Sequence, residues 1–155
     1  MITEQEVLAA QKKWAEGVVA IGRAYHEHGD FKSAALNHLE QSYGYELGPV
    51  LFKPTMAHEQ PFRTDLEGAL SYFIGGNPMY AEDHGFALKN WKKVRWENAG
   101  IKIFENIALA MGNYYFTPSV GGEEVKVEYS FAYLKNEQGN LRIILHDSHF
   151  PFKTG

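Results

Sequence analysis

The alternation between Val125 and Tyr133 is the feature that most restricts the fold of this chain. Every second residue there is apolar or aromatic: Val125, Val127, Tyr129, Phe131 and Tyr133. The residues between them are mostly polar. Because successive side chains of a strand point to opposite faces, the segment predicts a β-strand with one apolar and one mixed face. Another layer of the protein must cover the apolar face.

Further strands are predicted around this segment. Apolar runs in the second half of the chain are separated by the turn-rich stretches PSVGGE and NEQGN. The predicted strands there are GFALKNW, KVRWENA, IKIFENIALAMGNYYFT, VKVEYSFAYLK and LRIILHDSHF. Short connections of this kind favour long antiparallel strands. Upstream, the apolar run PVLFKPT is closed by Pro54 and predicts a strand, at the edge of the sheet or elsewhere.

Three helices are predicted before these strands. Thr3 and Glu6 have capping-box spacing, and the apolar residues that follow recur at intervals of three or four: Val7, Ala10, Trp14, Val18, Ile21 and Tyr25. Asp30 can cap a second helix that stops at Gly44. Thr64 and Glu67 predict a third helix that ends at Gly75, followed by a loop over residues 76–86 that could form a lid.

This order of elements predicts a single α+β domain over residues 1–155. N-terminal helices would pack on the concave side of a strongly curved antiparallel sheet and leave a small pocket between the two layers. Such a pocket is where we expect the function.

Composition narrows the partners. Fifteen basic and nineteen acidic residues give a formal charge of -4 without blocks of either sign, so we expect no nucleic-acid partner. Zero cysteines exclude disulfides and cysteine-ligated zinc. No apolar run is long enough to span a membrane, and the polar start MITEQE lacks the pattern of a signal peptide. A cytoplasmic location is therefore expected.

The stretch LRIILHDSHF places two histidines, an aspartate and a serine at the end of the last predicted strand. Parity puts His146 and Ser148 on one face, and Asp147 and His149 on the other. A metal held by His146 and His149 would need both rings on one side, so we predict no metal site. Two interpretations remain open. Spacing favours a strand that exits into solvent, while a functional pair would let histidine position or deprotonate a water beside substrate-binding hydroxyls.

The chain resembles the iota-class carbonic anhydrases and their bacterial relatives from about Trp14 to Phe152. The resemblance lies in GPVLFKPT, PFRTDLEGALSYFIGG, EDHGFAL, NIALAMGNYYFT, KVEYSFAY and LRIILHDSHFPF. This family belongs to the SnoaL-like, cystatin-like superfamily, which includes the association domain of calcium/calmodulin-dependent kinase II. The resemblance implies a helix-covered cone and reversible hydration of carbon dioxide to bicarbonate. It further implies that the small-molecule substrate is handled without metal or cofactor, and that the protein is a homodimer.

The resemblance also assigns the pocket residues. Thr55, Tyr72, His146 and Ser148 match the family's pocket positions, which implies hydroxyls contacting water and bicarbonate around a histidine that orients or deprotonates the water. The family's last strand typically ends His-His-Ser-Ser, whereas Asp147 and His149 occupy the second and fourth of those positions here. Parity places both changes on the face away from His146 and Ser148.

Two other functions stay open. One is a non-catalytic module for ligand binding or oligomerisation, as in the kinase association domain. The other is a SnoaL-like isomerase, which would need a carboxylate base deep in the pocket. Alternation cannot place the candidate bases, which are Glu46, Glu59, Glu97, Glu105 and Glu128.

Overall fold

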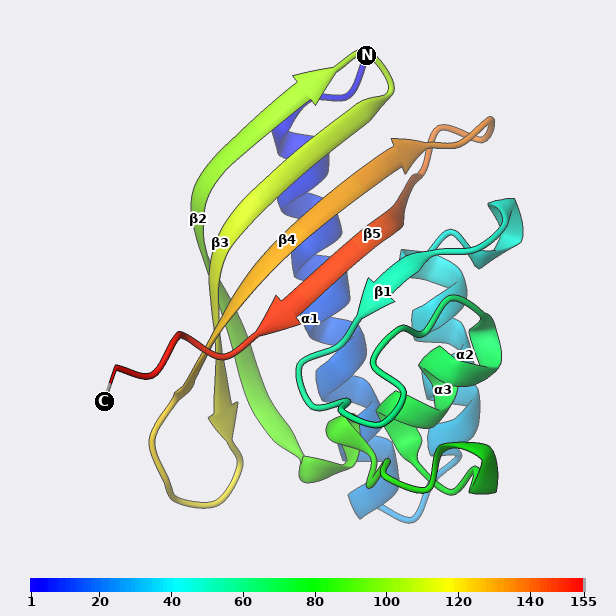
Figure 1. The fold of residues 1–155 in the computed structure, drawn as a ribbon, viewed down its shortest axis with the longest axis vertical. Coiled ribbons are helices and arrows are strands. Elements are labelled where there is room, and N and C mark those ends of the chain that lie inside the picture. Colours follow the sequence, from blue (N-terminus) through cyan, green and yellow to red (C-terminus); the bar gives the residue numbers. More distant parts are fainter. Residues whose placement is uncertain (155) are drawn as a thin grey trace.

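A computed structural model describes residues 1–154 and forms two layers, a five-stranded sheet and a set of helices that covers one of its faces (Figure 1). The α-helices of this part of the chain are α1 (Glu4–His26), α2 (Phe31–Ser42) and α3 (Leu66–Ile74). The strands are β1 (Leu51–Lys53), β2 (Trp91–Phe104), β3 (Ile107–Pro118), β4 (Val125–Lys135) and β5 (Leu141–His149). Short 3-10 helices span Tyr45–Leu47, Pro78–Tyr80 and Phe86–Lys89.

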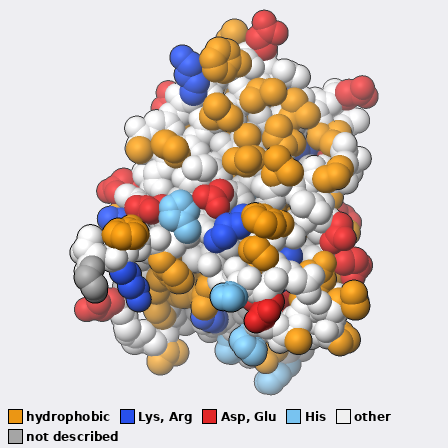
Figure 2. Space-filling view, viewed as in Figure 1, with side chains coloured by type: hydrophobic (Ala, Val, Ile, Leu, Met, Phe, Trp, Pro, Cys, Tyr) orange, Lys and Arg blue, Asp and Glu red, His pale blue; other side chains and the backbone are white. Residues whose placement is uncertain are grey.

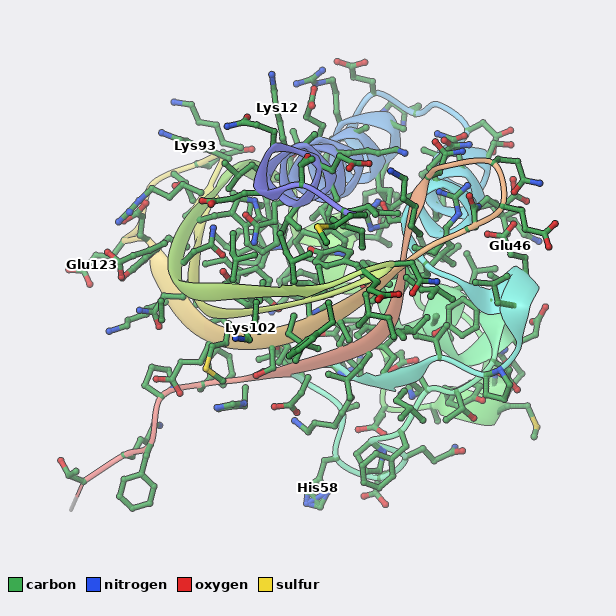
Figure 3. The ribbon with its side chains drawn as sticks, turned by 90° about the horizontal axis from the view of Figure 1, so that it is seen from above. Lys12, Glu46, His58, Lys93, Lys102 and Glu123 are labelled. Carbon is green, nitrogen blue, oxygen red and sulfur yellow. The ribbon has the colours of Figure 1, made fainter. Side chains whose placement is uncertain are left out.

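The sheet is mixed, in the order β1-β5-β4-β3-β2. Strands β2 to β5 pair antiparallel, whereas β1 runs parallel to β5. The expectation of a wholly antiparallel sheet is therefore wrong for β1. Parallel strands need a long crossover connection, and the chain between β1 and β5 passes through α3 and through strands β2 to β4. The α+β cone itself is confirmed, with the sheet curling around α1 (Figure 3).

The first helix follows the predicted pattern. Its capping box is present, with the Glu6 amide donating to the Thr3 hydroxyl over 3.2 Å and the Thr3 amide donating to the Glu6 carboxylate over 3.0 Å. Val7, Trp14 and other residues of its apolar stripe are buried against the concave face of the sheet. The helix thus supplies the covering layer that the alternation in β4 requires.

The third helix begins one residue later than predicted. Its N-cap is Asp65, whose carboxylate accepts from the Gly68 amide over 2.8 Å, so the capping box assigned to Thr64 and Glu67 is wrong. The Thr64 carbonyl instead accepts from the Val50 amide, which ties Thr64 to the chain before β1. Tertiary pairing therefore takes Thr64 out of the helix.

Two strand predictions also change. The segment GFALKNW is a 3-10 turn before β2, because Gly85 and Asn90 at its ends both adopt positive φ angles, of 85° and 58°. Residues 91–104 form one long β2, with a register shift between Asn98 and Gly100, and IKIFENIALAMGNYYFT contains a hairpin turn at residues 105–106. The alternation predicted in β4 is confirmed, since Val127, Tyr129, Phe131 and Tyr133 are buried. No helix among residues 1–154 is long and apolar enough to cross a membrane.

Candidate functional site

A small cavity, here called the inner cavity, lies between the helices and the concave face of the sheet. Its volume is about 10 Å³, which is room for about one water molecule. Its lining residues are Trp14, Phe52, Pro54, Thr55, Tyr72, Phe73, Phe86, Tyr114, Phe116, His146 and Ser148. The four residues assigned to the pocket from the sequence, Thr55, Tyr72, His146 and Ser148, therefore meet around one small space. No carboxylate is among these lining residues.

The ends of β1 and β5 bring two of the hydroxyls together. Parallel pairing sets Phe52 beside His146, and Pro54 then ends the strand because proline cannot donate to the ladder. Thr55 follows this break, and its hydroxyl oxygen lies 2.5 Å from that of Ser148.

Tyr72 reaches the same place from α3. Its side chain is buried, and its hydroxyl accepts a hydrogen bond from the Met56 amide over 3.3 Å. The Thr55 side chain also interacts with this hydroxyl. Burial raises the pKa of Tyr72, so it remains a neutral phenol. Its hydroxyl therefore does not point into water.

His146 sits deep among aromatic rings. It is 2% exposed, and the rings of Phe52 and Phe131 lie 4.8 and 4.1 Å from its own, centroid to centroid. Burial lowers its pKa well below the usual value, which keeps the imidazole neutral. Its Nδ1 atom lies 2.8 Å from the Tyr43 hydroxyl and its Nε2 atom 3.0 Å from the Tyr114 hydroxyl. Both ring nitrogens are therefore engaged.

Ser148 shares the buried face with His146, whereas Asp147 and His149 face outward. Ser148 is 1% exposed, and its hydroxyl lies 2.5 Å from that of Tyr114. On the outer face, His149 contacts Asp147 over 3.0 Å and Glu128 over 3.1 Å. The division of the four residues by parity is confirmed. The interpretation of His146 and Ser148 as a strand exit into solvent is wrong.

Sequence reasoning missed three polar groups around this site. Tyr114 comes from β3, Tyr43 from the C-cap of α2, and Trp14 donates its indole N–H to the Tyr43 hydroxyl over 2.9 Å. Trp14 belonged to the apolar stripe of the first helix, so only its packing was predicted. Tyr114 would have been placed inward if the hairpin turn before β3 had been located, since Ala108, Ala110, Tyr114 and Phe116 keep one parity.

A buried histidine beside the site was also missed. His38 on α2 is 3% exposed and packs edge-on against Trp14 and Phe73. Neither of its ring nitrogens has a hydrogen-bond partner among residues 1–154. Desolvation lowers the pKa of His38 to about 3, so it is neutral at physiological pH.

A buried arginine holds the two loops next to the cavity. The Arg63 guanidinium donates to both carboxylate oxygens of Asp83 over 2.7 and 2.8 Å, and the Ser71 hydroxyl on α3 donates to the same carboxylate over 2.6 Å. The neighbouring Glu82 accepts from the His58 and Gln60 amides. The loop over residues 76–86 is thereby fixed to the segment that carries Thr55.

The candidate bases of an isomerase lie away from the inner cavity. Glu46 pairs with Arg142 over 2.8 Å and points away from the molecule in Figure 3. Glu128 pairs with His149 on the outer face, and the side chains of Glu59, Glu97 and Glu105 are exposed. Within residues 1–154, no three histidine, aspartate or glutamate side chains are grouped so that they could hold a metal ion.

A larger hollow of about 730 Å³ lies between α1 and β2. Its rim carries several basic side chains, and Figure 3 shows Lys12 on α1 and Lys93 on β2 extending into solvent beside it. It is wide and open to water, and the flexible side chains of its lysines do not fix a ligand in one orientation. Size alone would select this hollow, but catalysis by positioned donors favours the inner cavity, where the polar groups are buried and held.

Comparison with known proteins agrees with this geometry. The family model described as "Metal-independent carbonic anhydrase" matches residues 5–150. A metal-independent carbonic anhydrase of Nostoc sp. (strain PCC 7120) is 46% identical over 155 residues, which is 98% of this chain and 75% of that protein. The crystal structure of an iota-carbonic anhydrase from a cyanobacterium, complexed with bicarbonate, is similar with a TM-score of 0.96 and 46% identity, covering 99% of this chain and 94% of that one.

More distant structures share the fold alone. A putative ketosteroid isomerase from Parabacteroides distasonis is 15% identical, with a TM-score of 0.60 and coverage of 94% of this chain and 85% of that one. This level of identity carries no argument about activity.

Proposed function

Because the chain belongs to the metal-independent carbonic anhydrase family, we propose that the inner cavity is its catalytic site and that Thr55, Tyr72, His146 and Ser148 form this site. The protein is an enzyme that converts carbon dioxide and water reversibly into bicarbonate and a proton. The observation that carries the assignment of the site is the meeting of four hydroxyls, those of Thr55, Tyr72, Tyr114 and Ser148, and one imidazole around a cavity the size of one water.

The lining of the inner cavity suits a small, apolar and linear substrate. Because the cavity itself holds about one water, we propose that carbon dioxide also occupies the adjoining hollow that shares Tyr72 and Phe86 with it. Aromatic rings form most of its wall, and they accept carbon dioxide without competing for hydrogen bonds. The polar groups gather at the Thr55 side, where they can contact the oxygen atoms of the substrate. A pocket of this kind binds carbon dioxide weakly and stabilises charge once it forms.

We assign Thr55 and Tyr72 as the donors that stabilise the developing bicarbonate. The oxygen of a water attacks the carbon of carbon dioxide. The electron pair of one carbon–oxygen double bond then moves onto the carbon dioxide oxygen of that bond. The Tyr72 hydroxyl already accepts from the Met56 amide, so its own hydrogen is available to the new oxyanion. Thr55, whose side chain interacts with this hydroxyl, can donate beside it. Donors that are already in place require no reorganisation as charge develops.

His146 then acts through other residues. Its two nitrogens are engaged by Tyr43 and Tyr114, and burial disfavours its charged form, so it is poorly suited to hold the proton of the water. We propose that it positions Tyr114 and, through it, Ser148. In this scheme the hydroxyls of Ser148 and Thr55 contact the attacking water and orient it.

The proton needs a route to solvent, because the lining has no carboxylate. A second hollow of about 70 Å³ adjoins the inner cavity and shares Tyr72 and Phe86 with it. Met56, Glu82, His84 and Lys89 are among its other lining residues. We propose that water in this hollow carries the proton away and that bicarbonate leaves on the same side.

Stopped-flow measurement of carbon dioxide hydration on chelator-treated protein tests this proposal. We expect full activity after chelation and a loss of about 100-fold or more in kcat/KM for His146→Ala and Ser148→Ala. Ser130→Ala is the matched control, because Ser130 faces outward on β4 opposite Asp147. Wild-type activity no higher than buffer would favour a ligand-binding module. Activity that vanished on chelation and returned with zinc or manganese would contradict a metal-free reaction.

We further propose a homodimer built on the outer face of the sheet. Leu109, Ala132, Leu145 and Leu51 lie side by side across four strands on the face opposite α1. Leu51 and Met111 are exposed by 60% and 56%, and Figure 2 shows hydrophobic side chains gathered over this part of the sheet. Such a patch is a candidate interface for a second copy. Sedimentation of the wild type and Leu109→Glu tests it, with a dimer expected only for the wild type.

A cytoplasmic location is likewise a proposal, tested by cell fractionation.

A further inference from the structure

A chain of hydrogen bonds links the first helix to the inner cavity, and its starting group can only donate. The indole N–H of Trp14 donates to the Tyr43 hydroxyl over 2.9 Å. The same hydroxyl lies 2.8 Å from Nδ1 of His146. Because the hydroxyl oxygen already accepts from Trp14, its hydrogen is directed to Nδ1. That nitrogen is therefore the acceptor of His146.

The remaining bonds inherit this direction. A neutral imidazole carries one N–H, which must then sit on Nε2 and donate to the Tyr114 hydroxyl over 3.0 Å. Tyr114 in turn donates to Ser148, and Ser148 donates to Thr55, each over 2.5 Å. The hydrogen of Thr55 is left for Tyr72 or for a molecule in the cavity.

We propose that Trp14 sets the direction of this chain, so that it holds His146 as the Nε2–H tautomer and turns the last hydroxyl into a donor toward the substrate. Trp14, Tyr43 and Tyr114 are then positioning residues that act through His146 and Ser148. The kinetic part of this inference rests on the proposed function. The tautomer of His146 does not.

The reverse direction leaves a buried hydrogen without an acceptor. If Nδ1 carried the proton, it would donate to the Tyr43 oxygen, which would then accept from both His146 and Trp14. The Tyr43 hydroxyl hydrogen would have no acceptor among residues 1–154. The neighbouring rings are those of Tyr45, Phe52, Phe73 and His38, and neither nitrogen of His38 is within hydrogen-bond distance of a partner. Leaving a buried donor unpaired is costly, so the observed contacts favour one direction.

Nitrogen-15 NMR of histidine side chains tests the tautomer directly. Two-bond proton–nitrogen spectra distinguish a protonated Nε2 from a protonated Nδ1, and a His146→Gln spectrum assigns the signals. We expect Nε2 to be protonated and Nδ1 to carry the shift of a hydrogen-bonded acceptor, unchanged between pH 6 and 8, a range about the ordinary histidine pKa of about 6.5. In Trp14→Phe, the Tyr43 hydroxyl is free to accept, and we expect the Nδ1–H form to become detectable. A wild-type Nδ1–H tautomer would overturn the inference.

Trp96→Phe is the matched control. Trp96 lies in the same aromatic cluster, with its ring centroid 5.6 Å from that of Trp14, but its indole N–H has no partner among residues 1–154. We expect Trp14→Phe to lower kcat about tenfold with KM little changed, and Trp96→Phe to stay within about twofold of wild type. Equal losses in the two variants, or no change of the His146 signals in Trp14→Phe, would contradict the inference.

Tyr43→Phe keeps the test decisive if Trp14→Phe fails to fold. It removes the hydroxyl that donates to Nδ1, so the Nδ1 shift should move to that of a free acceptor, and an unmoved shift would overturn the inference. Because these spectra need no carbon dioxide hydration, an inactive wild type would refute the proposed function while the spectra still decided the direction of the chain.

Discussion

The two faces of β5 carry the same kinds of residue in opposite environments. On the inner face, His146 and Ser148 are 2% and 1% exposed and are joined to tyrosine hydroxyls. On the outer face, the side chains of His149 and Asp147 are 48% and 42% exposed and pair with each other in contact with water. A shift of one residue therefore separates a buried hydrogen-bond network from solvent-exposed polar contacts.

This difference sets how well each face of the last strand tolerates substitution. Asp147 and His149 lie on the outer face. Exposed charges are screened by solvent and contribute little to stability, whereas each polar group on the inner face needs a partner. We therefore expect substitutions of His146 and Ser148 on the inner face to change activity and folding, and substitutions of Asp147 and His149 on the outer face to change little.

Exchanging the residues across the strand should have the largest effect. The double variant Asp147→Ser and Ser148→Asp moves a carboxylate from solvent to a buried position beside Tyr114 and Thr55, where the partners of the side chain are neutral hydroxyls. An unpaired buried charge costs about 3–5 kcal/mol, so we expect the free energy of unfolding to fall by that order or the protein not to fold. Urea denaturation measures it.

Asp147→Ser alone is the control for this exchange, with an expected loss under about 0.5 kcal/mol. If the exchanged protein were as stable as this single variant, the inner face could not be as dry as the structure indicates.

Removing one inner hydroxyl should have the next largest effect. Tyr72→Phe takes away a donor to the substrate, and we expect kcat to fall by about 10–100-fold. Tyr133→Phe is the matched control, because Tyr133 is also buried but its hydroxyl has no partner among residues 1–154. Hydration rates by stopped flow compare the two. Similar rates for the two variants would remove Tyr72 from the reaction.

The parity of β5 was accessible from sequence because it depends only on neighbouring residues. The capping box of Thr3 and Glu6 and the alternation in β4 were predictable for the same reason. Tyr43 and Tyr114 were not, since they lie 103 and 32 residues from His146 in sequence and meet it only through the packing of α2 and the register of the sheet.

The register of the sheet contains irregularities that cannot be predicted from neighbouring residues. β4 and β5 shift against each other between Ala132 and Tyr133, and β1 joins the sheet in parallel. The site could be predicted as a His146 and Ser148 pair, with Thr55 and Tyr72 supplied by resemblance. The partners that hold the pair depended on the tertiary structure.

Acid should destabilise the buried side more than the outer side. The pKa of His38 is lowered to about 3 in the folded protein, against an ordinary histidine pKa of about 6.5 in the unfolded chain. Between these values the unfolded chain binds more protons, so stability falls as the pH drops below about 6.5 and is unaffected above it. At pH 5 the loss is about 2 kcal/mol from His38, and His146, whose pKa is lowered in the same direction, adds to it.

Urea unfolding between pH 7.5 and 5 measures this slope, across the ordinary histidine pKa of about 6.5. In His38→Phe, which keeps an aromatic ring beside Trp14, the pH dependence should weaken by about one proton. An unchanged slope would mean that His38 is protonated in the folded protein.

The smallest effect is expected on the outer face. In the double variant Asp147→Asn and His149→Gln, both side chains stay polar and similar in size, and only the contacts among His149, Asp147 and Glu128 are lost. Since those contacts are about half exposed, we expect a change in unfolding free energy under about 0.5 kcal/mol and a kcat/KM within about twofold of wild type. Neither side chain lines the inner cavity. A loss of activity comparable to that of Ser148→Ala would show that the outer face takes part in catalysis, and the separation of the two faces would then be wrong.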